Sequence, residues 1–171
     1  MASSCNFLEV APNGWNGSEV DCPNGCGGSP AKTSDYGSKG IGTGRGYAFC
    51  SGMGEKNLIP NASELSIGAG YANTQSMVAN CVSSDAGQRA QSYAGGGLSD
   101  WYLPSLDELN ALYYYPNRDA IGGFAAGAYW SSTQYAAETP QRYAYLMYFG
   151  SGKQDIEDKS NTYGVRPVRA F

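Results

Sequence analysis

The feature that most constrains the fold is a short helix with a clear start and end. Ser105 and Glu108 have the spacing of a capping box, in which each side chain binds the other residue's backbone N–H at a helix N-terminus. An apolar stripe follows, and Pro116 ends the helix. The stripe consists of Leu106, Leu109, Leu112 and Tyr113. We therefore predict a helix over residues 105–115 that packs one face on the core.

Strand-like runs separated by turn residues follow this helix to the end of the chain. They span residues 128–133, 142–149, 153–157 and 163–168. In the run 142–149, side chains alternate between two faces of the predicted strand. One face carries Tyr143, Tyr145, Met147 and Phe149, and the other carries Ala144, Leu146 and Tyr148. Neither face is polar, so we expect one to pack on the core and the other to expose aromatic groups, as binding patches do.

The first hundred residues have a different character. Residues 1–100 contain 18 of the 24 glycines and many turn signals, which predicts mostly loop. We expect short strands at 7–10 and 46–50 and short helices at 74–81 and 86–94, with Asp85 as the N-cap of the last helix. Alternating glycines over 39–46 fit no phosphate-binding pattern and are interpreted as a flexible connector. The length of 171 residues predicts a single domain over 1–171, with a loop-rich half (1–100) and a motif-bearing half (101–171).

Composition excludes several classes of function. The chain has no histidine, so histidine-based triads, general bases and metal ligands are absent. A net charge of −4 provides no basic surface for a phosphate backbone, and we expect no nucleic-acid partner. The start lacks a secretory signal peptide, and no apolar run is long enough to cross a bilayer, so we expect no membrane insertion.

All the cysteines lie in the first half. They are Cys5, Cys22, Cys26, Cys50 and Cys81. Their odd number prevents complete pairing within one chain. The spacing of Cys22 and Cys26 lacks the second ligand pair of a structural zinc site, so we assign no metal site. One or two disulfides, or free thiols, remain open, and the pairing is not determined.

A series of ordered motifs in the second half resembles a known family. The motifs are Gly96-Gly-Leu-Ser-Asp-Trp-Tyr-Leu-Pro-Ser105, Glu108-Leu109, Tyr129-Trp-Ser-Ser-Thr133 and Val165-Arg-Pro-Val-Arg-Ala-Phe171. They resemble the domain family named for the C-terminal domain of a bacterial collagen-like adhesin, which has the C-type lectin fold and is related to formylglycine-generating-enzyme-like domains. Leu8-Glu-Val-Ala-Pro-Asn-Gly-Trp15 is similar to the family's opening strand. The resemblance implies an α+β, C-type lectin fold of short mixed or antiparallel strands, two or three helices and extensive loops.

We assign the motif residues to the scaffold of this fold. Trp101 and Trp130 are large enough to anchor the core, and Ser131 and Ser132 are expected to satisfy backbone groups. Arg166 and Arg169 are expected to pair with internal carboxylates or carbonyls. The remaining scaffold residues are Leu103, Pro104 and Glu108.

The resemblance does not carry over catalysis. The related formylglycine-generating enzymes use a reactive cysteine pair near the end of the fold, and here no cysteine follows Cys81. The Glu-Pro-Asn and Trp-Asn-Asp signatures of calcium-dependent sugar sites are also absent. We therefore expect no enzyme activity, no catalytic residue and no cofactor, with calcium elsewhere left open. A degenerate enzyme using Asp155, Glu157 and Asp158 is the alternative.

Some proteins of this fold are diversified by retroelements that change template adenines, which gives a variable ligand-binding face on a fixed scaffold. In residues 129–164, scaffold motifs alternate with residues of types that an Asn codon encodes after its adenines are replaced by other bases. The predicted ligand-binding residues are Tyr135, Thr139, Tyr143, Tyr145, Leu146, Tyr148, Ser151, Asp155, Ile156, Asp158, Ser160, Asn161, Thr162 and Tyr163. Tyrosine suits such a face because it gives a large amphipathic contact at low entropic cost.

This prediction implies a receptor-binding display protein on a virion or cell surface. Its partner would be a protein or cell-surface ligand, and oligomerisation is possible. The alternative within the same fold is a non-variable adhesin or structural tail module, in which the tyrosines pack on another copy or on a neighbouring domain.

Overall fold

The computed structural model describes residues 7–17, 20–21, 32–33, 35–36, 46–52, 56–82, 85–139 and 141–171. Cys5, Cys22, Cys26 and residues 39–45 of the predicted connector lie outside these ranges. The helices are α1 (Gly70–Asn80), α2 (Ala86–Gln91) and α3 (Leu106–Tyr114), with 3-10 turns at Gly95–Gly97 and Arg118–Ile121. The strands are β1 (Leu8–Val10), β2 (Val20–Asp21), β3 (Lys32–Thr33), β4 (Tyr47–Ala48), β5 (Ala128–Tyr135), β6 (Tyr143–Tyr148), β7 (Gln154–Asp158), β8 (Thr162–Tyr163) and β9 (Val168–Ala170). This is the mixed α+β architecture that the sequence predicts.

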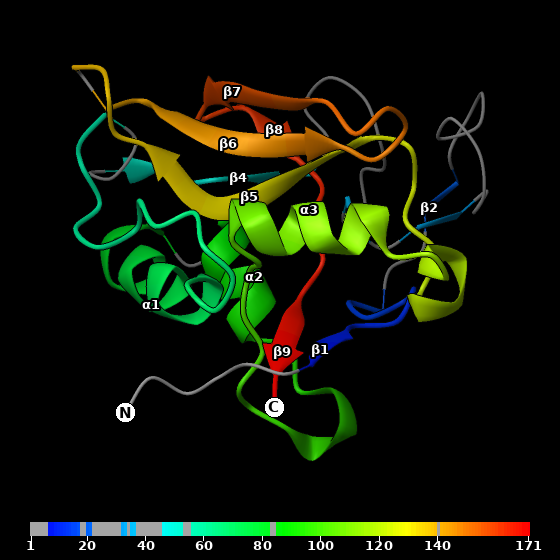
Figure 1. The fold of residues 1–171 in the computed structure, drawn as a ribbon. Helices are drawn as coiled ribbons and strands as arrows, with labels where there is room; N and C mark the ends of the chain where they lie inside the picture. Colours follow the sequence, from blue (N-terminus) through cyan, green and yellow to red (C-terminus); the bar gives the residue numbers. More distant parts are fainter. Residues whose placement is uncertain are drawn as a thin grey trace.

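The largest sheet of the described residues is antiparallel, in the order β5-β6-β7 (Figure 1). Two further pairs, β1 with β9 and β4 with β8, join the first half of the chain to its end. At the second pair, a Cβ on Gly46 would lie 2.4 Å from the carbonyl oxygen of Tyr163, and Gly46 has a φ of +105°. Only glycine allows this close approach of the two strands.

Helix α3 begins as the sequence predicts. The Ser105 side chain accepts the Glu108 N–H, and the Glu108 carboxylate accepts the Ser105 N–H at 2.8 Å. The same carboxylate accepts the Gly68 N–H at 2.9 Å and the Tyr102 hydroxyl at 3.2 Å. Burial raises the pKa of Glu108, which these hydrogen bonds oppose. Glu108 therefore joins α3 to the loop before α1 as well as capping its own helix.

The sheet is buried on both faces at one end. Trp130 and Leu146 are register partners whose side chains enter one core cluster. The next pair, Tyr129 and Met147, enters a second cluster that includes Leu109 of α3. The expectation that one face of 142–149 is exposed throughout is therefore wrong, because α3 covers the end that carries Met147.

The buried scaffold agrees with the sequence prediction except at Ser132. Trp101 and Trp130 are buried, and the Ser131 hydroxyl donates to the Tyr145 carbonyl at 2.9 Å. The Ser132 hydroxyl instead accepts the Asn73 side-chain amide at 3.4 Å, while the Ser132 backbone N–H donates to the Pro104 carbonyl at 2.7 Å. Leu103 is buried as well. These contacts tie β5 to β6 and to the segment before α3.

Both arginines of the closing motif pair with carboxylates of the chain, Arg166 in the core and Arg169 at the surface. Arg166 is fully buried and binds Asp35 through Nε–Oδ1 at 2.6 Å and Nη2–Oδ2 at 2.7 Å. The Asp35 carboxylate also accepts the Tyr129 hydroxyl at 2.6 Å and the Trp15 indole N–H at 3.1 Å. Arg169 pairs at the surface, at 2.9 Å from both Asp100 and Glu9. Asp35 is a central core residue that no sequence motif indicated.

Several local predictions differ from the structure. The helix predicted at 74–81 begins already at Gly70, and the helix predicted at 86–94 ends at Gln91. The closing strand 163–168 is divided into β8 and β9, because the side chain of Arg166 turns inward to Asp35 and Pro167 has no N–H for a ladder. The strand at 46–50 is limited to β4. Asp85 occupies the N-cap position of α2, but its side chain does not cap the helix and instead accepts hydrogen bonds from Ser51 and Val82.

Candidate binding face

The strand register gathers aromatic side chains at the open end of the sheet. Tyr135 of β5 pairs with Tyr143 of β6, and Tyr145 pairs with Ile156 of β7. Residues opposite each other share a face, and so do residues two apart on one strand. Tyr135, Tyr143, Tyr145 and Ile156 therefore lie on one face, which we call the tyrosine face. It is the same face that α3 covers at the other end of the sheet.

The tyrosine face is partly exposed because α3 ends its coverage before reaching it. All four side chains are of intermediate burial. The Tyr135 and Tyr145 rings meet edge to face, with centroids 5.6 Å apart. Burial raises the pKa of Tyr145, with a smaller contribution from Tyr135. Partial burial holds the rings in place and leaves amphipathic surface for a ligand.

A charged pair borders the tyrosine face. Asp158 lies opposite Tyr143 in the register and binds Arg142, whose side chain is 42% exposed. The Arg142 guanidinium lies 5.8 Å from the centre of the Tyr143 ring. Burial disfavours the charged form of Asp158, but hydrogen bonds from Ser160 and Arg142 outweigh it and lower its pKa. Arg142 was not among the predicted site residues, although its position directly before Tyr143 could have indicated it.

Exposed loop residues lie at the same end of the sheet. Thr139 is in the β5–β6 loop, and Ser160 and Asn161 are in the β7–β8 turn; all three are exposed. Ser151 is also exposed but lies in the β6–β7 turn, at the opposite end. The structure therefore separates Ser151 from the tyrosine face.

Other predicted ligand-binding residues lie on the far side of the sheet. Tyr148 and Asp155 alternate with the tyrosine-face residues along their strands and so point to the opposite face. Tyr163, next to Thr162 in β8, packs edge to face on Trp130 at 4.9 Å. Burial, followed by the charge of Glu157, raises the pKa of Tyr163 to about 12. These residues do not form one surface with Tyr143 and Tyr145.

The assignment of Leu146 to the ligand-binding residues is wrong. Leu146 is 0% exposed and belongs to the core cluster of Trp130. The alternation of β6 correctly separates Leu146 from Tyr145, but the face it enters is filled by core residues.

The three acidic residues of the enzyme alternative do not converge on one point. Asp155 and Glu157 share a face of β7, whereas Asp158 points to the other. Asp155 binds Lys153 at 2.5 Å, Glu157 accepts the Asn161 amide at 3.0 Å, and Asp158 binds Arg142. Each carboxylate thus has a neighbouring donor, and the strand geometry gives no shared carboxylate site.

A buried scaffold under an open aromatic sheet end defines a small α+β binding-type module of the lectin-like class. The chain belongs to the Lcl C-terminal domain family, whose family model matches residues 54–169. The matched range contains α1 to α3 and the whole β5-β6-β7 sheet. A search of curated proteins finds no match. In the part of the chain that the structure describes, no helix has the length and apolar character needed to span a membrane.

Proposed function

We propose that this protein is a display module that binds a protein or cell-surface ligand through its tyrosine face. The observation that carries the proposal is the grouping of Tyr135, Tyr143 and Tyr145 on one open sheet end, beside a core that does not depend on them. Tyrosine is enriched in adaptable binding sites because a rigid ring with a polar tip makes large contacts at low entropic cost.

The scaffold beneath the face supports this division of roles. Buried polar contacts at Ser131, Asp35 and Arg166 fix β5, β6 and the closing segment from behind. The tyrosine-face side chains lie outside both core clusters. Substitutions on the face therefore change contacts with a ligand while most of the buried apolar surface stays the same.

Diversification by a retroelement is the finer part of the proposal. Tyr135, Tyr143, Tyr145, Ile156 and Asp158 are all residue types that adenine changes in an Asn codon can reach. Thr139, Ser160 and Asn161 share this property and border the same end of the sheet. We place the variable face on these residues and exclude Leu146 and Tyr163, which pack in or against the core.

The proposal assigns the module to a virion or cell surface, with no catalytic role and no cofactor. A non-variable adhesin or tail module of the same family is the second candidate, and it would use the same face for one fixed partner.

A randomised library tests whether the face is adaptable. One library varies Tyr135, Tyr143, Tyr145 and Ile156, and it is selected for binding to lysozyme as a folded probe protein. A control library varies the same number of predicted residues outside the tyrosine face, namely Tyr148, Asp155, Thr162 and Tyr163. We expect binders and folded variants from the first library only. Equal numbers of binders from both libraries would contradict the assignment of the face.

A further inference from the structure

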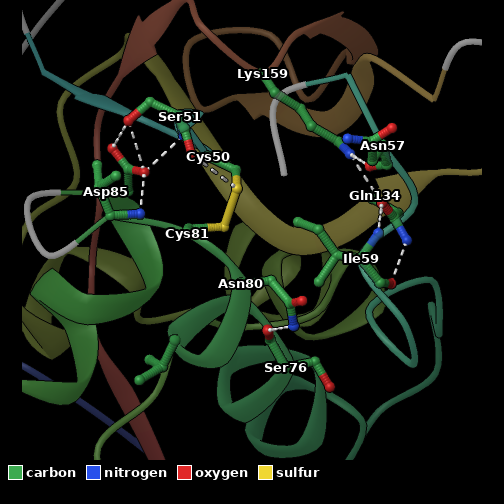
Figure 2. The surroundings of a disulfide bond; sticks show 12 residues. Cys50, Ser51, Asn57, Ile59, Ser76, Asn80, Cys81, Asp85, Gln134 and Lys159 are labelled. Atoms are coloured by element: carbon green, nitrogen blue, oxygen red, sulfur yellow. Dashed lines mark hydrogen bonds between the residues drawn. A yellow bond between two sulfur atoms is a disulfide. The ribbon is translucent and has the colours of Figure 1, made fainter. Parts of the chain in front are cut away.

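A second chemical cluster lies away from the tyrosine face, around the disulfide between Cys50 and Cys81 (Figure 2). Cys50 follows β4 and is fully buried, Cys81 ends α1 and is half-buried, and Asp85 precedes α2. The two sulfur atoms and a carboxylate oxygen of Asp85 all lie within 4.8 Å of one another. Among the described residues, this is the one group of three or more possible metal-ligating side chains whose ligand atoms lie so close together.

The Asp85 carboxylate binds the backbone directly after both cysteines. Its Oδ2 accepts the N–H of Ser51 at 2.6 Å and the N–H of Val82 at 3.2 Å. Ser51 and Val82 are the residues directly after Cys50 and Cys81. The Ser51 hydroxyl donates to Oδ1 of the same carboxylate at 2.8 Å. One side chain therefore connects both cysteine segments by hydrogen bonds.

Backbone hydrogen bonds anchor each cysteine further. The Cys50 N–H donates to the Lys159 carbonyl at 3.2 Å, and the Cys81 N–H donates to the Met77 carbonyl at 2.8 Å. The Cys81 carbonyl accepts the Gln88 amide at 2.9 Å. These contacts do not include sulfur, so they persist when the disulfide is reduced.

We infer that the reduced form of this cluster is a zinc site, with the thiolates of Cys50 and Cys81 and the carboxylate of Asp85 as ligands and water in the fourth position. Thiolate and carboxylate are zinc ligands, and soft sulfur ligands favour Zn²⁺ over Ca²⁺ or Mg²⁺. The N–H groups of Ser51 and Val82 then orient the ligating carboxylate, as outer hydrogen bonds do in metal sites.

Reduction opens the site and oxidation closes it. A dithiol reductant gives one hydrogen to each sulfur and becomes a cyclic disulfide, and Zn²⁺ then displaces the two thiol protons. The sulfur atoms must separate to about 3.8 Å, as two Zn–S bonds of about 2.3 Å at a tetrahedral angle require. Side-chain rotation of the half-buried Cys81 provides this movement. The disulfide itself offers no thiolate, so the oxidised chain has no such site.

Cobalt binding to a simplified chain tests the inference. The test uses the full chain with Cys5, Cys22 and Cys26 replaced by Ser. A phosphine reduces the remaining disulfide: the phosphine and one water molecule form the phosphine oxide, and the two hydrogens of the water become the two thiol hydrogens. We expect Co²⁺ to bind one per chain with a thiolate-to-cobalt charge-transfer band, and Zn²⁺ to displace it. The oxidised chain should show no band.

Two variants and one control identify the ligands. Cys81→Ser should abolish the charge-transfer band, and Asp85→Asn should weaken cobalt binding at least tenfold. Asp107→Asn changes an exposed carboxylate in α3 and should leave cobalt binding unchanged. Circular dichroism of the reduced chain is measured in parallel. An unfolded reduced chain, a folded one without the band, or equal affinities for the parent and Asp85→Asn would each overturn the inference.

Discussion

The buried pair of Asp35 and Arg166 provides a quantitative test of the scaffold. Asp35→Asn keeps the size of the side chain but removes its charge, which leaves a fully buried guanidinium without its carboxylate. Loss of one partner from a buried ion pair typically costs about 3–5 kcal/mol. The Tyr129 hydroxyl and the Trp15 indole N–H, which also donate to Asp35, are part of the same buried network, so we expect a cost within this range. We expect the free energy of unfolding to fall by about 4 kcal/mol.

Thermal and denaturant unfolding measure this loss. For a chain of this length, 1 kcal/mol shifts the unfolding midpoint by about 2–4 °C, so the expected decrease is roughly 8–16 °C. Urea unfolding with an unchanged m-value shows that stability, rather than the unfolded state, has changed.

A double-mutant cycle separates the ion pair from other effects. Arg166→Met alone leaves the buried Asp35 carboxylate without its cationic partner, whereas the double variant removes both charges. We expect the double variant to lose at least about 2 kcal/mol less free energy of unfolding than the two single variants lose when their losses are added. Additive effects, or a cost below about 1 kcal/mol for Asp35→Asn, would refute the reasoning.

Three further predictions concern the two faces of β6, the N-terminal cap of α3 and a buried amine. Leu146→Ala should lower the free energy of unfolding, measured with urea, by about 2–5 kcal/mol because it opens a cavity in a filled core. Tyr143→Ala, in the same strand, should lower it by about 1 kcal/mol or less. Equal losses would contradict the placement of the two side chains on opposite faces. Glu108→Ala should lower the free energy of unfolding by about 2–4 kcal/mol, since it leaves the Gly68 and Ser105 N–H groups without their acceptor. Hydrogen exchange at these two amides should become faster. Unchanged exchange rates would contradict the assignment. Burial lowers the pKa of Lys159 to about 8, below its unfolded value of about 10.4, so the unfolded chain binds more protons between these values and stability rises with pH there. Relative to Lys159→Met, the parent should gain about 2 kcal/mol between pH 8 and pH 10. A flat or falling difference would contradict the burial of the charged form.

Local signals in the sequence predicted the helix and the main sheet correctly. The capping box of Ser105 and Glu108 and the stop at Pro116 depend on neighbours within a few residues, so they could be recognised directly. The division of the closing strand could not, because Arg166 turns toward Asp35, which is 131 positions away in the sequence. The pairing of Cys50 with Cys81 was likewise undetermined, since five cysteines allow many pairings.

The candidate site was predicted only in part, for the same physical reason. Alternation places Tyr143 and Tyr145 on one face and Leu146 on the other, but it does not tell which stretch of a face α3 covers. Tyr163 was predicted to bind ligand from its residue type, yet it packs on Trp130 through the β4–β8 pair. Arg142 pairs at the face with Asp158, which belongs to the neighbouring strand β7 and which the local sequence does not reveal.

The DNA around the 3′ end of the gene tests the variable face most directly. We predict a nearby, almost identical copy that differs only at adenines, beside a reverse transcriptase gene. Its differences should fall in the codons of Tyr135, Tyr143, Tyr145 and Ile156 and spare those of Trp130 and Arg166. A copy whose differences spread evenly over face and scaffold codons, or the absence of any copy, would contradict the proposed diversification.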